Sequence, residues 1–110
     1  MRNELILKGT INLLILTQIS KKPMYGYAIE KEINSMINTP LPTGTIYTLL
    51  HNLENRNFIK FTVKKNNNGR ISKIYEITPD GKKFLKFHLE PLNTVSMIIK
   101  YLISEIPKIT

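Results

Sequence analysis

The sequence predicts a mainly α-helical fold with one small β-hairpin. Three observations predict it: apolar residues recur with helical spacing up to Asn57, β-branched and aromatic alternation replaces them after that residue, and helical spacing returns after Thr78. With 110 residues and 42% hydrophobic side chains, the chain has room for one hydrophobic core. We therefore expect a single compact unit.

The first two elements are predicted to be helices. Residues 5–20, LILKGTINLLILTQIS, carry closely spaced aliphatic side chains without proline, which favours a mostly buried helix. This helix should end near Ser20, because Pro23 pushes the residue before it out of the α region. Residues 25–37 form the second predicted helix, whose apolar face holds Ala28, Ile29, Ile33, Met36 and Ile37.

A proline-rich connection separates the second helix from the third. Pro40 and Pro42 fix φ and remove two donors, so residues 38–42 should be extended, with room for a turn or a very short edge strand. The third helix opens at Thr43-Gly44-Thr45, and its buried stripe is Ile46, Leu49, Leu50 and Leu53. Its opposite face is polar and uncharged, comprising Gly44, Tyr47, Thr48, His51 and Asn55.

Two strands and a basic turn follow. Residues 58–64 and 72–78 are β-branched or aromatic runs with polar alternation, which is typical of strands. The connection contains Asn68-Gly69, a strong hairpin signal, between Lys65 and Arg70. We expect a long hairpin with a cationic tip.

The last predicted helix begins at Thr78 or its neighbour, with Pro79 and Asp80 in its first turn, and runs to about Ile106. Pro91 either kinks this helix or divides it into two. Side chains three or four residues apart form an apolar seam, and such a seam packs against another helix. We expect it to be a dimer interface, made by Leu85, His88, Leu92, Val95, Ile99, Leu102 and Ile106.

Charge and composition narrow the class of protein. The net charge is +8, and the stretch from Arg56 to Lys86 alone carries nine basic and two acidic side chains, which suggests a polyanionic partner. The absence of cysteine excludes disulfides, thiolate metal sites and a cysteine nucleophile. No signal peptide or membrane-spanning run is present, so a cytoplasmic location is expected. No metal-ligand spacing, phosphate loop or catalytic grouping appears, so we expect no enzyme, metal or cofactor.

This order of elements is that of a winged helix-turn-helix, over residues 1–79, followed by a dimerisation helix over residues 80–110. The third helix would enter the major groove of double-stranded DNA and the hairpin, as the wing, would lie against phosphates or the minor groove. The candidate DNA-binding residues are Thr43, Gly44, Thr45, Tyr47, Thr48, His51 and Asn52 in the recognition helix, Tyr25 at the start of the second helix, and Lys64, Lys65, Asn68, Arg70 and Lys73 in the wing.

Several motifs in this order resemble the PadR family of transcriptional regulators. They are Met24-Tyr25-Gly26-Tyr27, Gly44-Thr45-Ile46-Tyr47, Leu50-His51-Asn52-Leu53-Glu54 and Ile74-Tyr75-Glu76-Ile77-Thr78-Pro79-Asp80-Gly81, and the likeness spans roughly residues 5 to 85. The resemblance implies a homodimeric repressor joined through its C-terminal helix, and often a small hydrophobic or phenolic effector, whose identity here is open. Pro42 and Asn52 depart from the family pattern, so either Thr43 caps the third helix or its cap is weak, and the wing becomes the main source of phosphate affinity.

Other interpretations compete with these at particular positions. Tyr47 either contacts DNA or packs at the rim of the core. Of Tyr25 and Tyr27, one should enter the core, with Tyr25 the exposed one. For the whole chain, the alternative is a winged-helix module that binds protein and never DNA, since a fold alone does not fix function.

Overall fold

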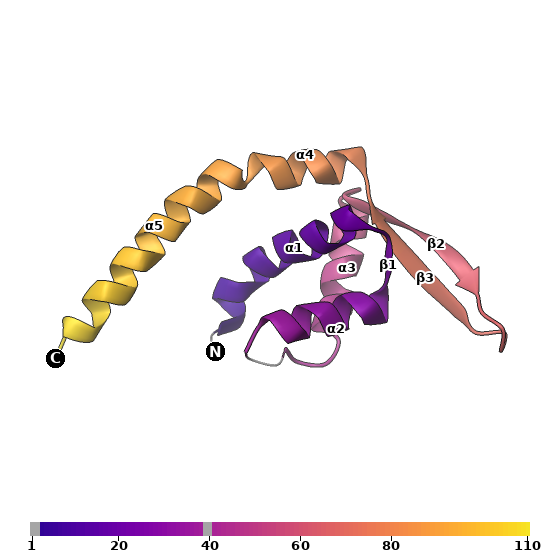
Figure 1. Cartoon of the computed structure of the whole chain (residues 1–110), viewed down its shortest axis with the longest axis horizontal. Helices are drawn as coiled ribbons and strands as arrows, with labels where there is room; N and C mark the ends of the chain where they lie inside the picture. Colours follow the sequence, from indigo (N-terminus) through magenta and orange to yellow (C-terminus); the bar gives the residue numbers. More distant parts are fainter. Residues whose placement is uncertain (1–2, 39–40) are drawn as a thin grey trace.

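The computed structural model describes residues 3–38 and 41–110, with side chains from Lys8 onward. Figure 1 shows a winged-helix body from which the last helix extends as an arm. The elements are α1 (Asn3–Lys21), β1 (Met24–Tyr25), α2 (Gly26–Met36), α3 (Thr45–Asn55), β2 (Ile59–Lys65), β3 (Ile71–Ile77), α4 (Pro79–Phe87), α5 (Leu89–Glu105) and a 3-10 turn, η1 (Ile106–Lys108).

The hydrophobic core lies where α1, α2 and α3 meet the base of the sheet. The predicted stripe of α3 is buried, and Ile29 and Ile33 of α2 pack with it. The α1 contribution is Ile11, Ile15, Leu16 and Ile19. Full burial of one such side chain contributes roughly 1.5–3 kcal/mol, so this cluster holds the three helices together. The predicted buried stripe of α3 is therefore confirmed, whereas on the predicted face of the second helix only Ile29 and Ile33 are buried and Met36 is 51% exposed.

The hairpin is confirmed, and a third strand joins it. β2 and β3 pair antiparallel from Ile59 opposite Ile77 to Lys65 opposite Ile71. β1 adds to the other edge of β3, with Met24 opposite Tyr75, giving the order β1-β3-β2.

The prediction that the second helix begins at Tyr25 is wrong by one residue. Tyr25 is extended (φ −69°, ψ 151°), because it pairs with Ile74 of β3, so α2 begins at Gly26. The edge strand of the sheet thus precedes α2. Of the connection expected to be extended, Thr39 and Pro40 lie outside the described residues.

Thr78 joins the wing to α4 as the predicted cap. Its hydroxyl accepts a hydrogen bond from the Gly81 N–H at 3.0 Å and donates one to the Asn57 carbonyl at 2.7 Å. A Cβ on Gly81 would collide with the Phe58 carbonyl oxygen and lie 2.7 Å from Cγ1 of Ile77. Glycine at this position therefore allows the start of α4 to pack directly on the sheet.

The last helical segment is two helices, and they separate at His88. Pro91 has no N–H to donate to the Phe87 carbonyl, and its ring would clash with that carbonyl in a continuous helix. The backbone instead turns at His88 (φ −85°, ψ −1°), and Pro91 lies in the first turn of α5, where a missing N–H costs little. A single helix to Ile106 is therefore wrong, and the two-helix alternative is correct.

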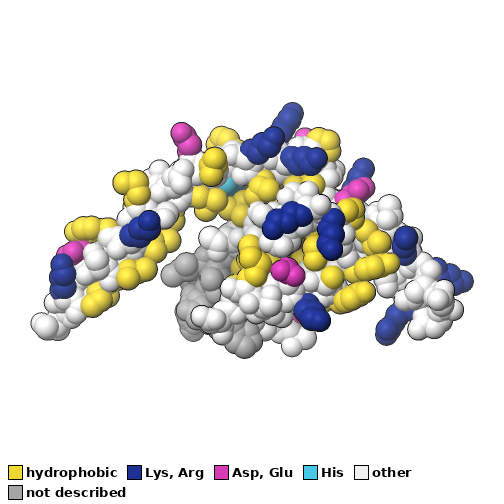
Figure 2. All heavy atoms as spheres, in the orientation of Figure 1, with side chains coloured by type: hydrophobic (Ala, Val, Ile, Leu, Met, Phe, Trp, Pro, Cys, Tyr) yellow, Lys and Arg dark blue, Asp and Glu magenta, His cyan; other side chains and the backbone are white. Residues whose placement is uncertain are grey.

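The two halves of this segment differ in burial. Leu85 of α4 packs against the core, whereas α5 buries no residue against the described part of the chain. Figure 2 shows hydrophobic side chains along the arm that α5 forms. This arm and the wing extend the molecule to 59 Å in its longest direction.

Candidate nucleic-acid interface

The outer face of α3 is the uncharged polar surface that the sequence predicted. Tyr47, Thr48, His51 and Asn52 are all exposed, while the apolar stripe between them points into the core. A helix fixed by its buried stripe presents its other side in one defined orientation. This face carries hydrogen-bonding groups suited to reading base edges.

The start of α3 is shaped by backbone and not by a side-chain cap. Gly44 has φ 88° and ψ −10°, a left-handed conformation that favours glycine, and the Thr45 N–H donates to the Pro42 carbonyl at 3.1 Å. Within the described residues no side chain caps this helix, so the expected cap by Thr43 is not formed. The Thr45 N–H is therefore already paired, and no side chain among the described residues caps the rest of the first turn.

A hollow of about 340 Å³ at this point gathers five of the predicted contact residues and one that sequence reasoning missed. Lys8 of α1 lies on its edge, although it is distant from Gly44 along the chain. It places a positive charge beside α3, whose outer face has none. Helical spacing could not have found it, because the approach of α1 to this end of α3 is a tertiary feature. The lining is Lys8, Pro42, Thr43, Gly44, Thr45, Thr48, Leu49 and Asn52.

The wing carries its predicted basic residues at an exposed tip. Lys64, Lys65 and Arg70 are all exposed, and Figure 2 shows the basic side chains grouped at the end of the molecule opposite α5. Asn68 shapes the loop, since its Oδ1 accepts the Arg70 backbone N–H at 3.1 Å. Gly69 has φ 83°, which the tight turn requires.

Lys73 lies farther down the wing, with its Nζ 4.2 Å from the centre of the Phe61 ring. A cation over an aromatic face is held in place while its charge stays accessible. Lys60 instead pairs with Glu76 at 3.5 Å on the exposed side of the hairpin. The cations at the tip and Lys73 are therefore the ones in position to meet an anionic partner.

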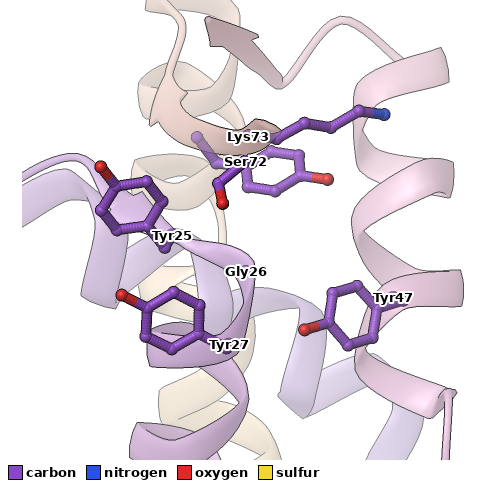
Figure 3. Close-up of a pocket in the computed structure, with 7 residues that line it drawn as sticks. Tyr25, Gly26, Tyr27, Tyr47, Ser72 and Lys73 are labelled. Carbon is purple, nitrogen blue, oxygen red and sulfur yellow. The ribbon is translucent and has the colours of Figure 1, made fainter. Parts of the chain in front are cut away.

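Between the wing and α3 lies a pocket of about 360 Å³ that we call the tyrosine pocket (Figure 3). Tyr25 and Tyr27 stack with their ring centres 5.4 Å apart. Neither enters the core, and Tyr27, 63% exposed, is the more exposed of the two, so the expectation that Tyr25 would be the exposed one is wrong. The lining residues are Tyr25, Gly26, Tyr27, Tyr47, Ser72, Lys73 and Tyr75.

Two of these tyrosines have perturbed acidity. Burial raises the pKa of Tyr47, and the negative charge of Glu30 raises it further. Burial likewise raises the pKa of Tyr75, with smaller contributions from Glu54 and Tyr47. Both hydroxyls therefore stay protonated, and able to donate, at neutral pH. Of these two residues, sequence reasoning identified Tyr47 and missed Tyr75.

The predicted seam divides between two environments. Leu85 packs on the core of its own subunit, and Nδ1 of His88 lies 2.7 Å from the Phe84 carbonyl oxygen. The four seam residues within α5 are 39–45% exposed. Other apolar side chains on α5 are more exposed still, so the uncovered surface is wider than a narrow seam. They include Leu89, Met97, Ile98, Tyr101 and Ile103.

Comparison with known proteins decides the family. The family model described as "Transcriptional regulator PadR-like family" matches residues 15–87, about two thirds of the chain. The chain belongs to the PadR-like family. The family consists of transcriptional regulators, and the winged-helix body with its C-terminal helix agrees with it.

Individual relatives agree with this PadR-like assignment. The chain is 38% identical in sequence to a proposed transcriptional regulator from Thermoplasma acidophilum, whose crystal structure matches with a TM-score of 0.86 over 90% of this chain and 95% of that one. A PadR-like transcriptional regulator from Bacillus cereus is 31% identical, with a TM-score of 0.75 over 89% and 95% of the two chains. An uncharacterised protein from Lysinibacillus sphaericus is 32% identical over 73% of this chain and 75% of its own length.

The structure adds two negative findings for this PadR-like chain. In residues 3–38 and 41–110, no helix is both long and apolar enough to cross a bilayer. The same residues contain no cluster of three or more histidine or acidic side chains that could hold a metal ion.

Proposed function

We propose that this PadR-like regulator binds double-stranded DNA sequence-specifically, with α3 in the major groove and the wing on phosphates or in the minor groove. One observation carries the proposal: an exposed, uncharged, hydrogen-bonding helix face lies beside an exposed basic hairpin. Phosphate contacts supply affinity that is largely independent of sequence, and base-edge contacts supply sequence preference. In this proposal the wing makes the phosphate contacts and α3 makes the base-edge contacts.

The proposed binding unit is a homodimer joined through residues 80–110, with residues 1–79 as the DNA-binding part. A helix that is apolar around much of its circumference and buries nothing within its own subunit needs a cover, and a two-fold partner provides an identical helix. Two recognition helices related in this way match an inverted repeat, with half-sites about one helical turn apart. A dimer bound to such an operator would exclude other proteins from the same stretch of DNA, so we propose that this regulator is a repressor. We propose the cytoplasm as its location.

The wing is tested by replacing Lys65 and Arg70 together with alanine. We expect weaker binding to every duplex, and a dependence of log Kobs on log salt that is shallower by about 0.9 for each phosphate that is no longer neutralised. Fluorescence anisotropy at salt concentrations from about 50 to about 200 mM measures both. The matched control is Lys82→Ala with Lys83→Ala, which removes the same charge from α4. An equal loss of affinity from the control would place the wing away from DNA.

Selection of bound duplexes from a random pool tests specificity and symmetry together. We expect a recovered inverted repeat. A pool that yields no enriched sequence, with no salt-dependent duplex binding, would favour the winged-helix module that binds protein instead of DNA.

A further inference from the structure

The tyrosine pocket has the composition of an anion site. Its floor is Gly26, the first residue of α2: a Cβ built there would lie 2.9 Å from Cε1 of Tyr47 and 3.6 Å from Cε2 of Tyr75. Both rings therefore lie close to the backbone of Gly26. Figure 3 shows Tyr47 reaching from α3 towards the start of α2, with the Ser72 hydroxyl above Gly26.

Tyr75 is the observation that points to a ligand. It is only 6% exposed, it lines the pocket, and its hydroxyl has no hydrogen-bond partner among the described residues. The Tyr47 hydroxyl has none there either. The Tyr75 hydroxyl oxygen is not among the fully buried unpaired polar atoms of the described residues, so it is reachable from the pocket. Two unpaired hydroxyls that open on one pocket can both donate to an acceptor that is not part of the subunit.

The start of α2 and Lys73 favour a negative charge on that acceptor, whereas the carboxylates of Glu30 and Glu54, which act on the Tyr47 and Tyr75 hydroxyls, oppose it. The eleven-residue helix α2 begins here, with no side-chain cap and no acidic residue in its first turn, so its free N–H groups and its dipole favour an anion. Lys73 supplies a full positive charge from β3. None of the described residues that line the pocket is a carboxylate.

We propose that the tyrosine pocket binds one backbone phosphodiester of DNA in each subunit, chiefly through uncharged donors, with Lys73 as the only full positive charge among the described residues that line it. This inference rests on the proposed function, because the pocket lies between α3 and the wing. A recognition helix in the major groove has a phosphate backbone on each side. Gly26 is a positioning residue, since it leaves room for the Tyr47 ring over the helix start.

The proposal makes a distinction that salt dependence can measure. A lysine that neutralises a phosphate releases a counterion, so its removal changes the salt slope. A tyrosine hydroxyl bonded to the same phosphate adds affinity and releases no counterion. Its removal should lower affinity at every salt concentration and leave the slope unchanged.

The experiment compares Tyr47→Phe, Tyr75→Phe and Lys73→Gln on one mixed-sequence duplex across a salt series. Each phenylalanine variant should bind about tenfold more weakly with an unchanged slope, as expected for a hydrogen bond to a charged group. Lys73→Gln should lower affinity and reduce the slope by about 0.9. Ser35→Ala, which removes an exposed hydroxyl from the other end of α2, is the control and should bind as tightly as the parent chain.

Gly26→Ala tests the floor of the pocket separately. The added methyl should displace the Tyr47 ring, a side chain that can move, so the thermal midpoint should change little while affinity falls as in Tyr47→Phe. Combining Gly26→Ala with Tyr47→Phe should cause no further loss of affinity, because both act on the same hydroxyl.

The possible outcomes distinguish a failure of the phosphate site from a failure of DNA binding itself. If the parent chain binds duplexes and both phenylalanine variants bind equally well, the phosphate site is overturned and DNA binding stands. If the parent chain binds no duplex even at low salt, the proposed function fails first. If inorganic phosphate raises the melting temperature of the parent but not of Tyr75→Phe, and DNA affinity is the same in both, the pocket binds free phosphate instead of DNA.

Discussion

Helices α3 and α5 both carry an apolar stripe, but the α3 stripe is buried within the subunit and the α5 stripe is not. Ile46, Leu49, Leu50 and Leu53 of α3 are at most 5% exposed, because α1, α2 and the sheet cover them. The corresponding side chains of α5 remain 39–45% exposed. The periodicity in the sequence is equally clear in both helices.

This difference shows what an apolar stripe can and cannot specify. It specifies that a helix face must be covered, because uncovered apolar surface is unfavourable in water. It does not specify whether the cover comes from the same chain. In α3 the neighbouring elements supply it, so the outer face is held in one orientation. In α5 the described part of the chain supplies none, and the proposed dimer would provide it.

Adding charge to the α5 stripe should produce the largest effect. Val95→Glu with Ile99→Glu places unpaired carboxylates in the proposed interface, which should raise the dimer dissociation constant roughly a thousandfold, about 4 kcal/mol. Light scattering after gel filtration should then show a monomer whose body unfolds cooperatively. DNA affinity should fall with dimerisation.

The control for that variant adds the same two charges to polar positions of α5. Asn93→Glu with Ser104→Glu should leave the mass and the DNA affinity of the dimer unchanged. Should the Val95 and Ile99 variant keep the mass of the parent chain, the cover of α5 is not a second copy, and the contrast with α3 needs another explanation.

One substitution made in both helices sharpens the comparison. Leu50→Ala opens a cavity in the core, and the free energy of unfolding should fall by about 2–5 kcal/mol whatever the protein concentration. Leu102→Ala removes surface only from the proposed interface, so its effect on the melting temperature should depend on protein concentration. Calorimetry at two concentrations differing about a hundredfold distinguishes them. A concentration-independent fall in stability from Leu102→Ala would contradict the interpretation of α5.

The fold was largely predictable because its signals are local. Proline placement, helical spacing and the Asn68-Gly69 turn located the helices and the hairpin within a few residues. β1 escaped prediction because two residues form a strand only when β3 lies beside them. The position of the break at His88 follows only when the clash of a proline ring with the carbonyl four residues earlier is considered. Because of that clash, the helix ends before Pro91.

The candidate site was predictable in part for the same reason. Exposed residues on one element, such as Thr48 and Arg70, follow from spacing alone. Lys8 and Tyr75 do not, since each enters the surface around α3 from an element distant in sequence. Tyr75 also has the alternation of an ordinary core residue in a strand. Only the free hydroxyl, visible in three dimensions, distinguishes it.

The smallest expected effect is a change in the free energy of unfolding at high pH, and it arises from two tyrosines of the winged-helix body. Because burial raises the pKa of Tyr47 and Tyr75, the unfolded chain ionises these phenols before the folded chain does. Both states hold the protons below about pH 10, so the two groups leave stability unchanged there; above it the unfolded state binds fewer protons, and the free energy of unfolding should fall. Urea denaturation from about pH 8 to about pH 11 measures the decline, and Tyr47→Phe with Tyr75→Phe should make it shallower. A decline that is equally steep in the double variant would mean that these two phenols do not carry it.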